Sequence, residues 1–418
     1  MHSTGAVVPP TNGLRVALDL TSLDAADVRL WFVEQLLRLA EGVEFVLLGS
    51  HATQQQVQRL QARSVCSLTL PDPSPLQAIV ARVDARLPAA RRRRRLVRRL
   101  DPSARVERAL SRARTGVLAG ARASVVFCPF TTPGVTAGPT PVVAAIHDLS
   151  HVSSPHLLTS RQRAARAWAF ADTADRATRI LCSTAEVRDI AAAEDNISFD
   201  RLTVVAPGRL LVRPAPEADV TRAVLDRYGL STRPFVVVIG ALEPRNNQRL
   251  VLTAFGLFRV RHPESDLTLV FASPSAIGLR SLRDAAVRMG LKDVVTVIGD
   301  VDEDALTALV DGCQTAVVAA LYDMLGERAL QAMALGRPTL VSSLPSLMAL
   351  TGDAVLRFDP HRPLDLLEAL ERLALEPGLG AQLSELGRRR LAMLDGSPTV
   401  AKAYMRVLRE VQCQAASR

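Results

Sequence analysis

Short apolar runs alternate with stretches of helical periodicity along the whole chain, and this alternation constrains the fold more than any other feature. Apolar runs bounded by turn residues predict buried strands, and the helical stretches between them predict crossover connections. The predicted strands lie at residues 14–20, 43–48, 125–128, 142–146, 180–182 and 202–205, and then at 235–239, 267–271, 294–298, 316–319, 339–341 and 354–358. Such a pattern is typical of parallel α/β sheets.

The pattern breaks once, at Pro207 and Gly208, and restarts after a proline-rich segment at residues 214–216. A length of 418 residues suits two domains better than one. We therefore predict two doubly wound Rossmann-like domains that face a cleft, covering residues 1–210 and 211–397. Ligands of such sheets bind beyond the carboxyl ends of the strands, so functional residues are expected where strands pass into loops.

Composition excludes several classes of protein. With 48% hydrophobic and 22% charged residues the chain can bury large cores and is not disordered by composition. No apolar run approaches the roughly 18 residues of a membrane-spanning helix, and residues 1–12 lack the pattern of a signal peptide. The five cysteines are scattered without CxxC spacing, which predicts neither a metal site nor disulfides. We expect a cytoplasmic protein without a metal.

Common catalytic and nucleotide-binding motifs are missing from the sequence. Residues 21–26 (TSLDAA) follow the first predicted strand and contain no GxGxxG, so a Rossmann dehydrogenase is disfavoured. From Ser22 this segment instead predicts a capped helix start. GxxxxGK[ST], GxSxG and HExxH are absent too, which leaves P-loop, serine-hydrolase and zinc-protease functions without support.

A basic insertion at residues 81–122 carries fourteen arginines against three acids, a local charge of +11 in a chain of net charge +9. Its densest part comprises Arg91, Arg92, Arg93, Arg94, Arg95, Arg98 and Arg99. Basic amphipathic helices bind anionic membrane surfaces, so the segment is interpreted as a peripheral membrane contact, with a solvated face or a partner-protein contact left open. Nucleic-acid binding is disfavoured because the segment has no aromatic residue for base stacking.

Seven short motifs follow one another in a characteristic order between residues 146 and 360, three of them before the break at Pro207 and Gly208 or at it. They are IHDL at 146–149, CST at 182–184, VVAPG at 204–208, GALEPRNN at 240–247, VIGDV at 297–301, ALYDMLGERALQAMALGRP at 320–338, and GDA with FDP at 352–354 and 358–360. In this order they resemble glycosyltransferase family 4, whose members have the GT-B fold.

The resemblance implies a metal-independent enzyme that needs no cofactor and transfers a sugar, with retention at the anomeric carbon, from a nucleotide-sugar donor to a glycan or lipid-linked acceptor. It places the donor site mainly in the second domain and the acceptor site mainly in the first. It also implies that a last helix, at residues 398–418, returns to the first domain.

The family's diphosphate loop matches residues that begin at Gly240. Catalysis requires positive charge or dipoles at the leaving diphosphate, but two positions that are commonly basic in the family carry Ala241 and Asn246. Arg245, together with the N–H groups of the following helix terminus, is then the candidate contact for the diphosphate.

The family's two hallmark glutamates fall on Asp323 and Gln331. Asp323 is about 1.5 Å shorter than a glutamate and is predicted to orient the reacting sugar, while Gln331 is predicted to hold the ribose. Between them only Gly326 of the usual glycine pair remains, and Glu327 with the following arginine is a candidate polar site on the donor side. In the first domain His147, at a strand end, is predicted to face the cleft.

Two alternative functions stay open. The altered donor motif also fits a pseudo-glycosyltransferase that supports an active partner glycosyltransferase and binds nucleotide sugars weakly. A nucleotide-sugar 2-epimerase shares the fold class, and its acid/base candidates would be His147 and Asp148.

Overall fold

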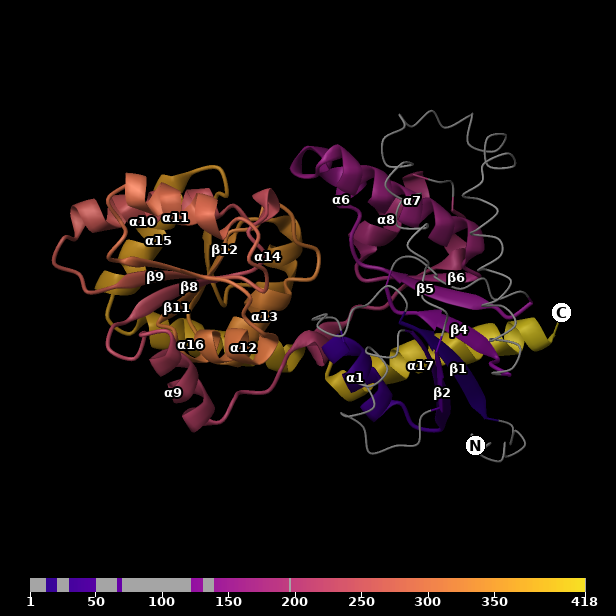
Figure 1. The fold of residues 1–418 in the computed structure, drawn as a ribbon. Coiled ribbons are helices and arrows are strands. Elements are labelled where there is room, and N and C mark those ends of the chain that lie inside the picture. Colours follow the sequence, from indigo (N-terminus) through magenta and orange to yellow (C-terminus); the bar gives the residue numbers. More distant parts are fainter. Residues whose placement is uncertain are drawn as a thin grey trace, which may run out of the picture. The chain divides into compact units, whose positions relative to one another are not determined.

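The computed structural model describes residues 13–20, 30–49, 66–69, 122–130, 139–194 and 197–417 (Figure 1). The basic residues Arg91–95, Arg98 and Arg99 lie outside this part of the chain, as does the helix start predicted at Ser22. The membrane contact therefore stays a prediction. No helix in the described part is both long enough and apolar enough to cross a bilayer.

The chain divides into two compact units. The first contains residues Met1–Ser153, Thr159–Ala206 and Pro398–Arg418, and the second contains Ser154–Leu158 and Pro207–Ser397. Each unit is built around one parallel sheet, so the prediction of two Rossmann-like α/β domains is confirmed.

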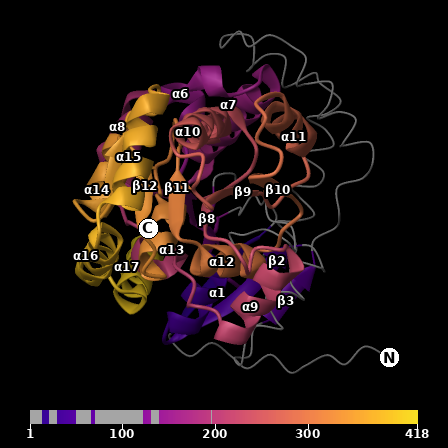
Figure 2. The same ribbon diagram turned by 90° about the vertical axis from the view of Figure 1, so that its left-hand side faces the viewer.

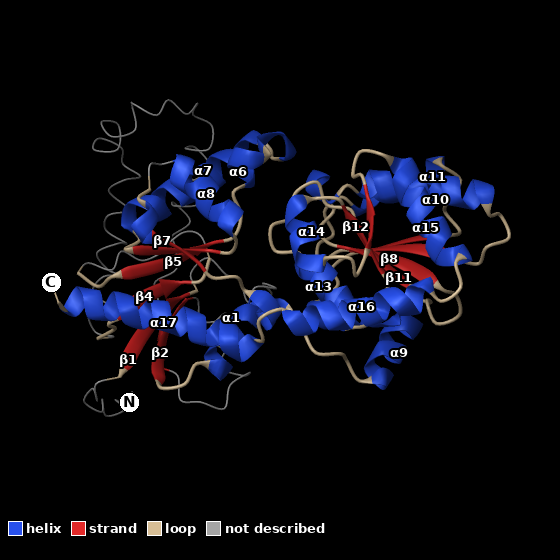
Figure 3. Cartoon of the chain, turned by 180° about the vertical axis from the view of Figure 1, so that it is seen from behind, coloured by secondary structure: helices blue, strands red, loops and turns tan. Residues whose placement is uncertain are grey.

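The first unit has a seven-stranded sheet in the order β3-β2-β1-β4-β5-β6-β7. Its strands are β1 (Leu14–Asp19), β2 (Val43–Gly49), β3 (Cys66–Thr69), β4 (Val125–Cys128), β5 (Val142–Ile146), β6 (Arg179–Cys182) and β7 (Leu202–Val204). Its helices are α1 (Leu30–Leu39), α6 (Ser150–Ser153), α7 (Ser160–Arg176), α8 (Ala185–Glu194) and α17 (Ser397–Ala416). In Figure 3, α1 and α17 lie on one face of the sheet and α7 and α8 on the other.

The second unit has a six-stranded parallel sheet in the order β10-β9-β8-β11-β12-β13. Its strands are β8 (Phe235–Ile239), β9 (Thr268–Ala272), β10 (Val295–Ile298), β11 (Thr315–Val318), β12 (Thr339–Ser342) and β13 (Leu356–Phe358). Its helices are α9 (Ala218–Arg227), α10 (Gln248–Arg261), α11 (Leu279–Arg288), α12 (Glu303–Gly312), α13 (Glu327–Ala334), α14 (Pro345–Thr351), α15 (Pro363–Leu375) and α16 (Leu379–Met393).

Both faces of the second sheet are covered, which explains why its strands are continuous apolar runs. Helices α10, α11 and α15 pack on one face, and α9, α12 and α13 on the other (Figures 1 and 2). The carboxyl ends of the strands therefore remain the natural place for a ligand site.

Helix α17 is held in the first unit by an apolar stripe. Its buried residues are Val400, Ala401, Tyr404, Met405, Val407, Leu408 and Val411, which recur at helical spacing. The side chains of Tyr404 and Leu408 are completely buried.

Replacing Leu408 by alanine should destabilise the first unit by about 2–5 kcal/mol, because it leaves a cavity under α17. The chain's two tryptophans, Trp31 and Trp168, both lie in this unit, so tryptophan fluorescence during denaturation reports on it. Arg406→Ala, at an exposed position of the same helix, is the matched control. A Leu408→Ala transition that coincides with the wild-type transition would contradict the assignment of α17 to this core.

Candidate functional site

The loop between β8 and α10 is shaped by two side-chain amides. Asn246 Nδ2 donates to the carbonyl oxygen of Ala241 at 2.7 Å, and Gln248 Nε2 donates to the same oxygen at 2.8 Å. Gly240 has a φ of 143°, and a Cβ there would lie 3.2 Å from Asn246 Nδ2. The carboxamide of Asn246 thus folds back over Gly240 and holds the loop, and its predicted contact with a donor is untested.

Arg245 links this loop to the next one along the sheet edge. Its carbonyl oxygen accepts a hydrogen bond from the main-chain N–H of Leu321 at 2.7 Å. Its guanidinium lies 2.9 Å from the carboxylate of Glu243. The bond to Leu321 brings the loops after β8 and β11 together, so Arg245 and Asp323 lie on neighbouring loops at one edge of the sheet.

Asp323 sits in a turn that its own side chain stabilises. Its Oδ1 accepts from the main-chain N–H groups of Leu325 at 3.0 Å and Gly326 at 2.9 Å, and the hydroxyl of Ser346 donates to its carbonyl oxygen. Gly326 has a φ of 58°, and a Cβ there would lie 2.8 Å from Leu350 Cδ1. Only glycine fits this turn without strain.

Burial raises the pKa of the Asp323 carboxyl above its ordinary value. The N–H groups of Gly326 and Leu325 oppose this rise, and so do the positive charges of Arg245 and Arg328. Asp323 is thus a partly buried carboxyl near two arginines, and perturbed carboxyls of this kind are candidates for functional sites.

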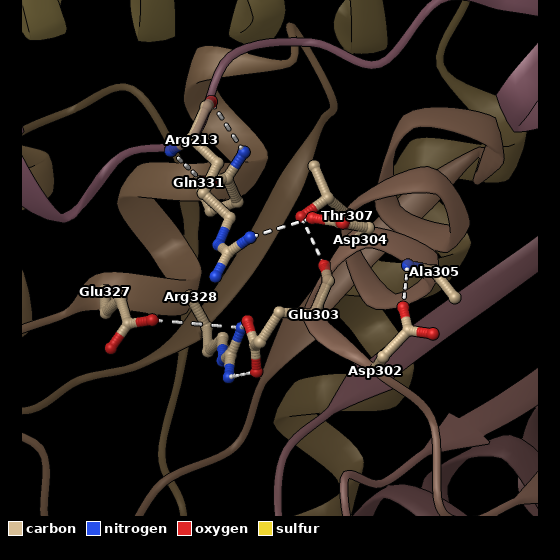
Figure 4. Close-up of polar contacts among 9 residues, drawn as sticks. All are labelled: Arg213, Asp302, Glu303, Asp304, Ala305, Thr307, Glu327, Arg328 and Gln331. Carbon is tan, nitrogen blue, oxygen red and sulfur yellow. Dashed lines mark hydrogen bonds and ion pairs between the residues drawn. The ribbon is translucent and has the colours of Figure 1, made fainter. Parts of the chain in front are cut away.

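A polar network joins the first turns of α12 and α13 (Figure 4). The guanidinium of Arg328 donates two hydrogen bonds to the carboxylate of Glu303, at 2.9 and 2.8 Å, and lies 3.9 Å from Glu327. Burial raises the pKa of Glu327, and the charges of Glu303 and Asp323 add to the rise while Arg328 opposes it. Despite its burial, Arg328 has a pKa above its ordinary value because these carboxylates surround it.

Gln331 is buried in the same region, with 4% of its surface exposed. Its Oε1 accepts from the main-chain N–H of Arg213 at 2.7 Å, and its Nε2 donates to the carbonyl oxygen of Arg213 at 3.2 Å. Figure 4 shows this two-way pairing, together with the ion pair of 2.9 Å between the Arg213 side chain and Asp304. The carboxamide thus clamps the segment that precedes α9, and the predicted ribose contact would have to displace part of that clamp.

In the first unit, His147 follows β5 directly. Its Nε2 lies 3.0 Å from the carbonyl oxygen of Pro129, and because a carbonyl only accepts, this nitrogen carries the proton. Asp148 accepts from the main-chain N–H of Ser150 at 2.7 Å and pairs with Arg166. Its carboxylate therefore stabilises a loop and an ion pair, which gives no support to an acid/base pair with His147.

The structure thus brings most of the predicted donor-side residues together in one unit. Gly240, Arg245, Asn246, Asp323, Gly326 and Glu327 lie in the loops that follow β8 and β11 or at the helix start after them, and Gln331 lies one turn further along α13. His147 lies in the other unit. Arg213 and Glu303 were missed: Arg213 contributes main-chain atoms that no side-chain pattern reveals, and Glu303 resembles any acid in a first helical turn. No group of metal-ligating side chains was found in the described part of the chain.

Comparison with known proteins bears directly on this edge of the second sheet. Residues 225–390 match the family model of glycosyl transferases group 1. These residues form a glycosyl transferases group 1 domain. The match includes both loops of the candidate site, from Gly240 to Gln331.

A relative of similar sequence is the D-inositol 3-phosphate glycosyltransferase of Streptomyces avermitilis, 27% identical over 261 residues. The alignment covers 60% of this chain and 56% of the relative, so it spans little more than half the relative's length.

Similar solved structures cover nearly the whole chain. A glycosyltransferase from Rickettsia africae ESF-5 superimposes with a TM-score of 0.69 at 9% identity, covering 96% of this chain and 99% of that one. Anabaena Alr3699/HepE, solved in complex with UDP and glucose, gives a TM-score of 0.64 at 14% identity. The superposition covers 95% of this chain and 100% of that one. These neighbours confirm the GT-B type of fold.

Changing Gln331 to glutamate should destabilise the second unit by about 3 kcal/mol, because a carboxylate cannot donate to the carbonyl of Arg213 and is buried against it. Calorimetric unfolding at neutral pH measures the loss. Stability should recover as the pH falls, since a protonated carboxyl can again donate. The control is Gln382→Glu on the exposed face of α16, and an equally stable Gln331→Glu protein would refute the clamp.

Changing Asp323 to asparagine should raise the melting temperature at neutral pH. A carboxyl whose pKa is higher in the folded than in the unfolded state favours folding only while protonated, and this contribution is lost as the pH rises through the folded-state pKa. Asparagine keeps the acceptor for Leu325 and Gly326 without a charge. The difference in melting temperature between variant and wild type should close as the pH falls toward 3.8, the ordinary pKa of an aspartate.

Calorimetry across this pH range measures the gap, with Asp266→Asn at an exposed position as the control. A gap that does not depend on pH would mean that ionisation of Asp323 costs the fold nothing.

Proposed function

We propose that the chain is a retaining glycosyltransferase that transfers a sugar from a nucleotide-sugar donor to a glycan or lipid-linked acceptor. The observation that carries this proposal is the junction of two loops within the matched domain, where the main chains of Arg245 and Leu321 are joined by a bond of 2.7 Å. One loop supplies a cation and the other supplies a desolvated carboxyl, Asp323.

The chemistry assigned to these residues follows from their charges. As the glycosidic bond of the donor breaks, negative charge develops on the departing diphosphate. In the proposal, Arg245 and the positive end of α10, which begins at Gln248, stabilise that charge. Asp323 orients the sugar, His147 acts on the acceptor side in the first unit, and the reaction needs no metal or other cofactor.

A second candidate function is a non-catalytic partner of an active glycosyltransferase. It is favoured by the diphosphate loop, in which Ala241 and Asn246 supply no cation and Arg245 already lies 2.9 Å from Glu243. It is also favoured by the clamp that occupies Gln331. The two candidates differ in whether a nucleotide diphosphate binds at all.

A nucleotide diphosphate should bind weakly to the wild-type chain, and Asn246→Lys should increase the affinity for it. Each missing charge-assisted contact forfeits roughly 1.5–3 kcal/mol, so two of them weaken binding by about 100-fold to 10⁴-fold. Thermal shift with millimolar UDP, GDP, ADP and dTDP, followed by calorimetric titration, measures the affinity. Arg245→Ala should abolish binding, whereas Arg288→Ala, exposed in the same unit, should leave it unchanged.

The same titrations separate the two candidates. The transferase is supported if one nucleotide binds and depends on Arg245. The non-catalytic partner is supported if no nucleotide binds to wild type and Asn246→Lys creates no binding. Gln331→Glu is omitted from this series because its effect on stability would obscure its effect on affinity.

A further inference from the structure

A continuous set of aromatic rings in the first unit leads from the C-terminal helix to His147. The imidazole contacts Phe130, with ring centroids 5.6 Å apart, and Phe32, with centroids 6.4 Å apart. Phe32 in turn contacts Tyr404 of α17 at 5.5 Å. We call these three residues, Phe130, Phe32 and Tyr404, the ring wall.

The ring wall draws its members from three separate elements, the segment after β4, helix α1 and helix α17. Phe32 is 2% exposed and Tyr404 is fully buried, and Phe127 of β4 packs on Tyr404 with centroids 5.9 Å apart. A fully packed interior allows little ring movement, because each displaced ring must displace its neighbours. Helix α17 therefore restricts the movement of the Phe32 ring through Tyr404.

The imidazole is held at its polar side as well. Its Nε2 donates to the carbonyl oxygen of Pro129 at 3.0 Å. The ring of Phe130 is tilted against the imidazole at 55°, and the ring of Phe32 packs edge-on at 68°. One hydrogen bond and two ring contacts fix both the direction and the tilt of the imidazole. In the neutral ring the acceptor nitrogen is then Nδ1.

We propose that Phe32 and Tyr404 are positioning residues for His147, and that the C-terminal helix fixes the imidazole of this candidate active-site residue. Tyr404 acts through Phe32. The inference rests on the proposed function only for the role of His147, since the ring contacts themselves hold whatever the chain catalyses.

The test measures the position of the ring directly, by NMR of the imidazole carbon-bound protons. The chain has seven histidines, and the signals lost in His147→Gln identify those of His147. Tyr404→Met and Phe32→Met remove a ring while retaining apolar volume, and tryptophan fluorescence verifies that each variant is folded. Both variants should shift the His147 signals, and Tyr404→Phe should restore the wild-type position.

A second histidine–phenylalanine pair in the same unit supplies the matched control. His151 and Phe170 have ring centroids 5.6 Å apart, so Phe170→Met should shift the signals of His151 and leave those of His147 in place. Tyr404→Met should do the reverse. This reciprocal result separates positioning of one ring from a general loosening of the unit.

Unchanged His147 signals in folded Tyr404→Met and Phe32→Met proteins would overturn the proposal. If both variants fail to fold, the milder Phe32→Leu decides, because this side chain contacts the imidazole directly and is 2% exposed. Unmoved His147 signals there would overturn the proposal too.

Where transferase activity is measurable, Phe32→Met should lower kcat by about 10-fold to 100-fold without changing the KM for donor, as expected for a displacement approaching 1 Å. Complete absence of activity in the wild type would count against the proposed function, while the NMR shifts would still decide the positioning role.

Discussion

The parallel pairing of β8 with β11 is the constraint on which the candidate site depends. Thr315 pairs with Val236 and Val317 with Val238, so both strands end at the same edge of the second sheet and their following loops meet. The bond between Arg245 and Leu321 then joins those loops through main-chain atoms alone. This junction uses no side-chain atoms, whereas the turn inside the second loop depends on the carboxylate of Asp323 and on Gly326.

The charges around this edge are unevenly distributed. Arg245 is the only cationic residue at positions 240–247, and it lies beside Glu243, whereas Arg328 is surrounded by Glu303, Glu327 and Asp323. Burial works against the ionised form of Asp323, so the folded unit retains a carboxyl that is less stable there than in water. Such a cost is typical of functional residues, which are selected for chemistry rather than for stability. In the first unit, His147 contacts the carbonyl oxygen of Pro129 through Nε2 and packs against the rings of Phe130 and Phe32.

Sequence periodicity was sufficient to predict the strands of both sheets except β3, whose four residues (CSLT) form no apolar run. Helix α7 has few apolar residues among its arginines and alanines, which is why it was not recognised from periodicity. At the site, motif order located the loops around Gly240 and Asp323, since local sequence dictates turn geometry. It did not reveal that Gln331 pairs with the main chain of Arg213, 118 residues away. Arg213 contributes only main-chain atoms to this contact, so the residue type at position 213 does not reveal it.

This clamp ties the proposed ribose contact of Gln331 to the conformation of the segment before α9. Gln331 offers one acceptor and one donor group, and Arg213 uses both. A ribose that bonded to the carboxamide would have to replace at least one of these bonds, and the released main-chain group of Arg213 would then need water or another partner. Linkage is reciprocal. If binding of the donor weakens the clamp, the clamp weakens binding of the donor by the same free energy. A charged glutamate at this position could not make both bonds to Arg213, so the glutamine favours the ordered conformation of the segment before α9.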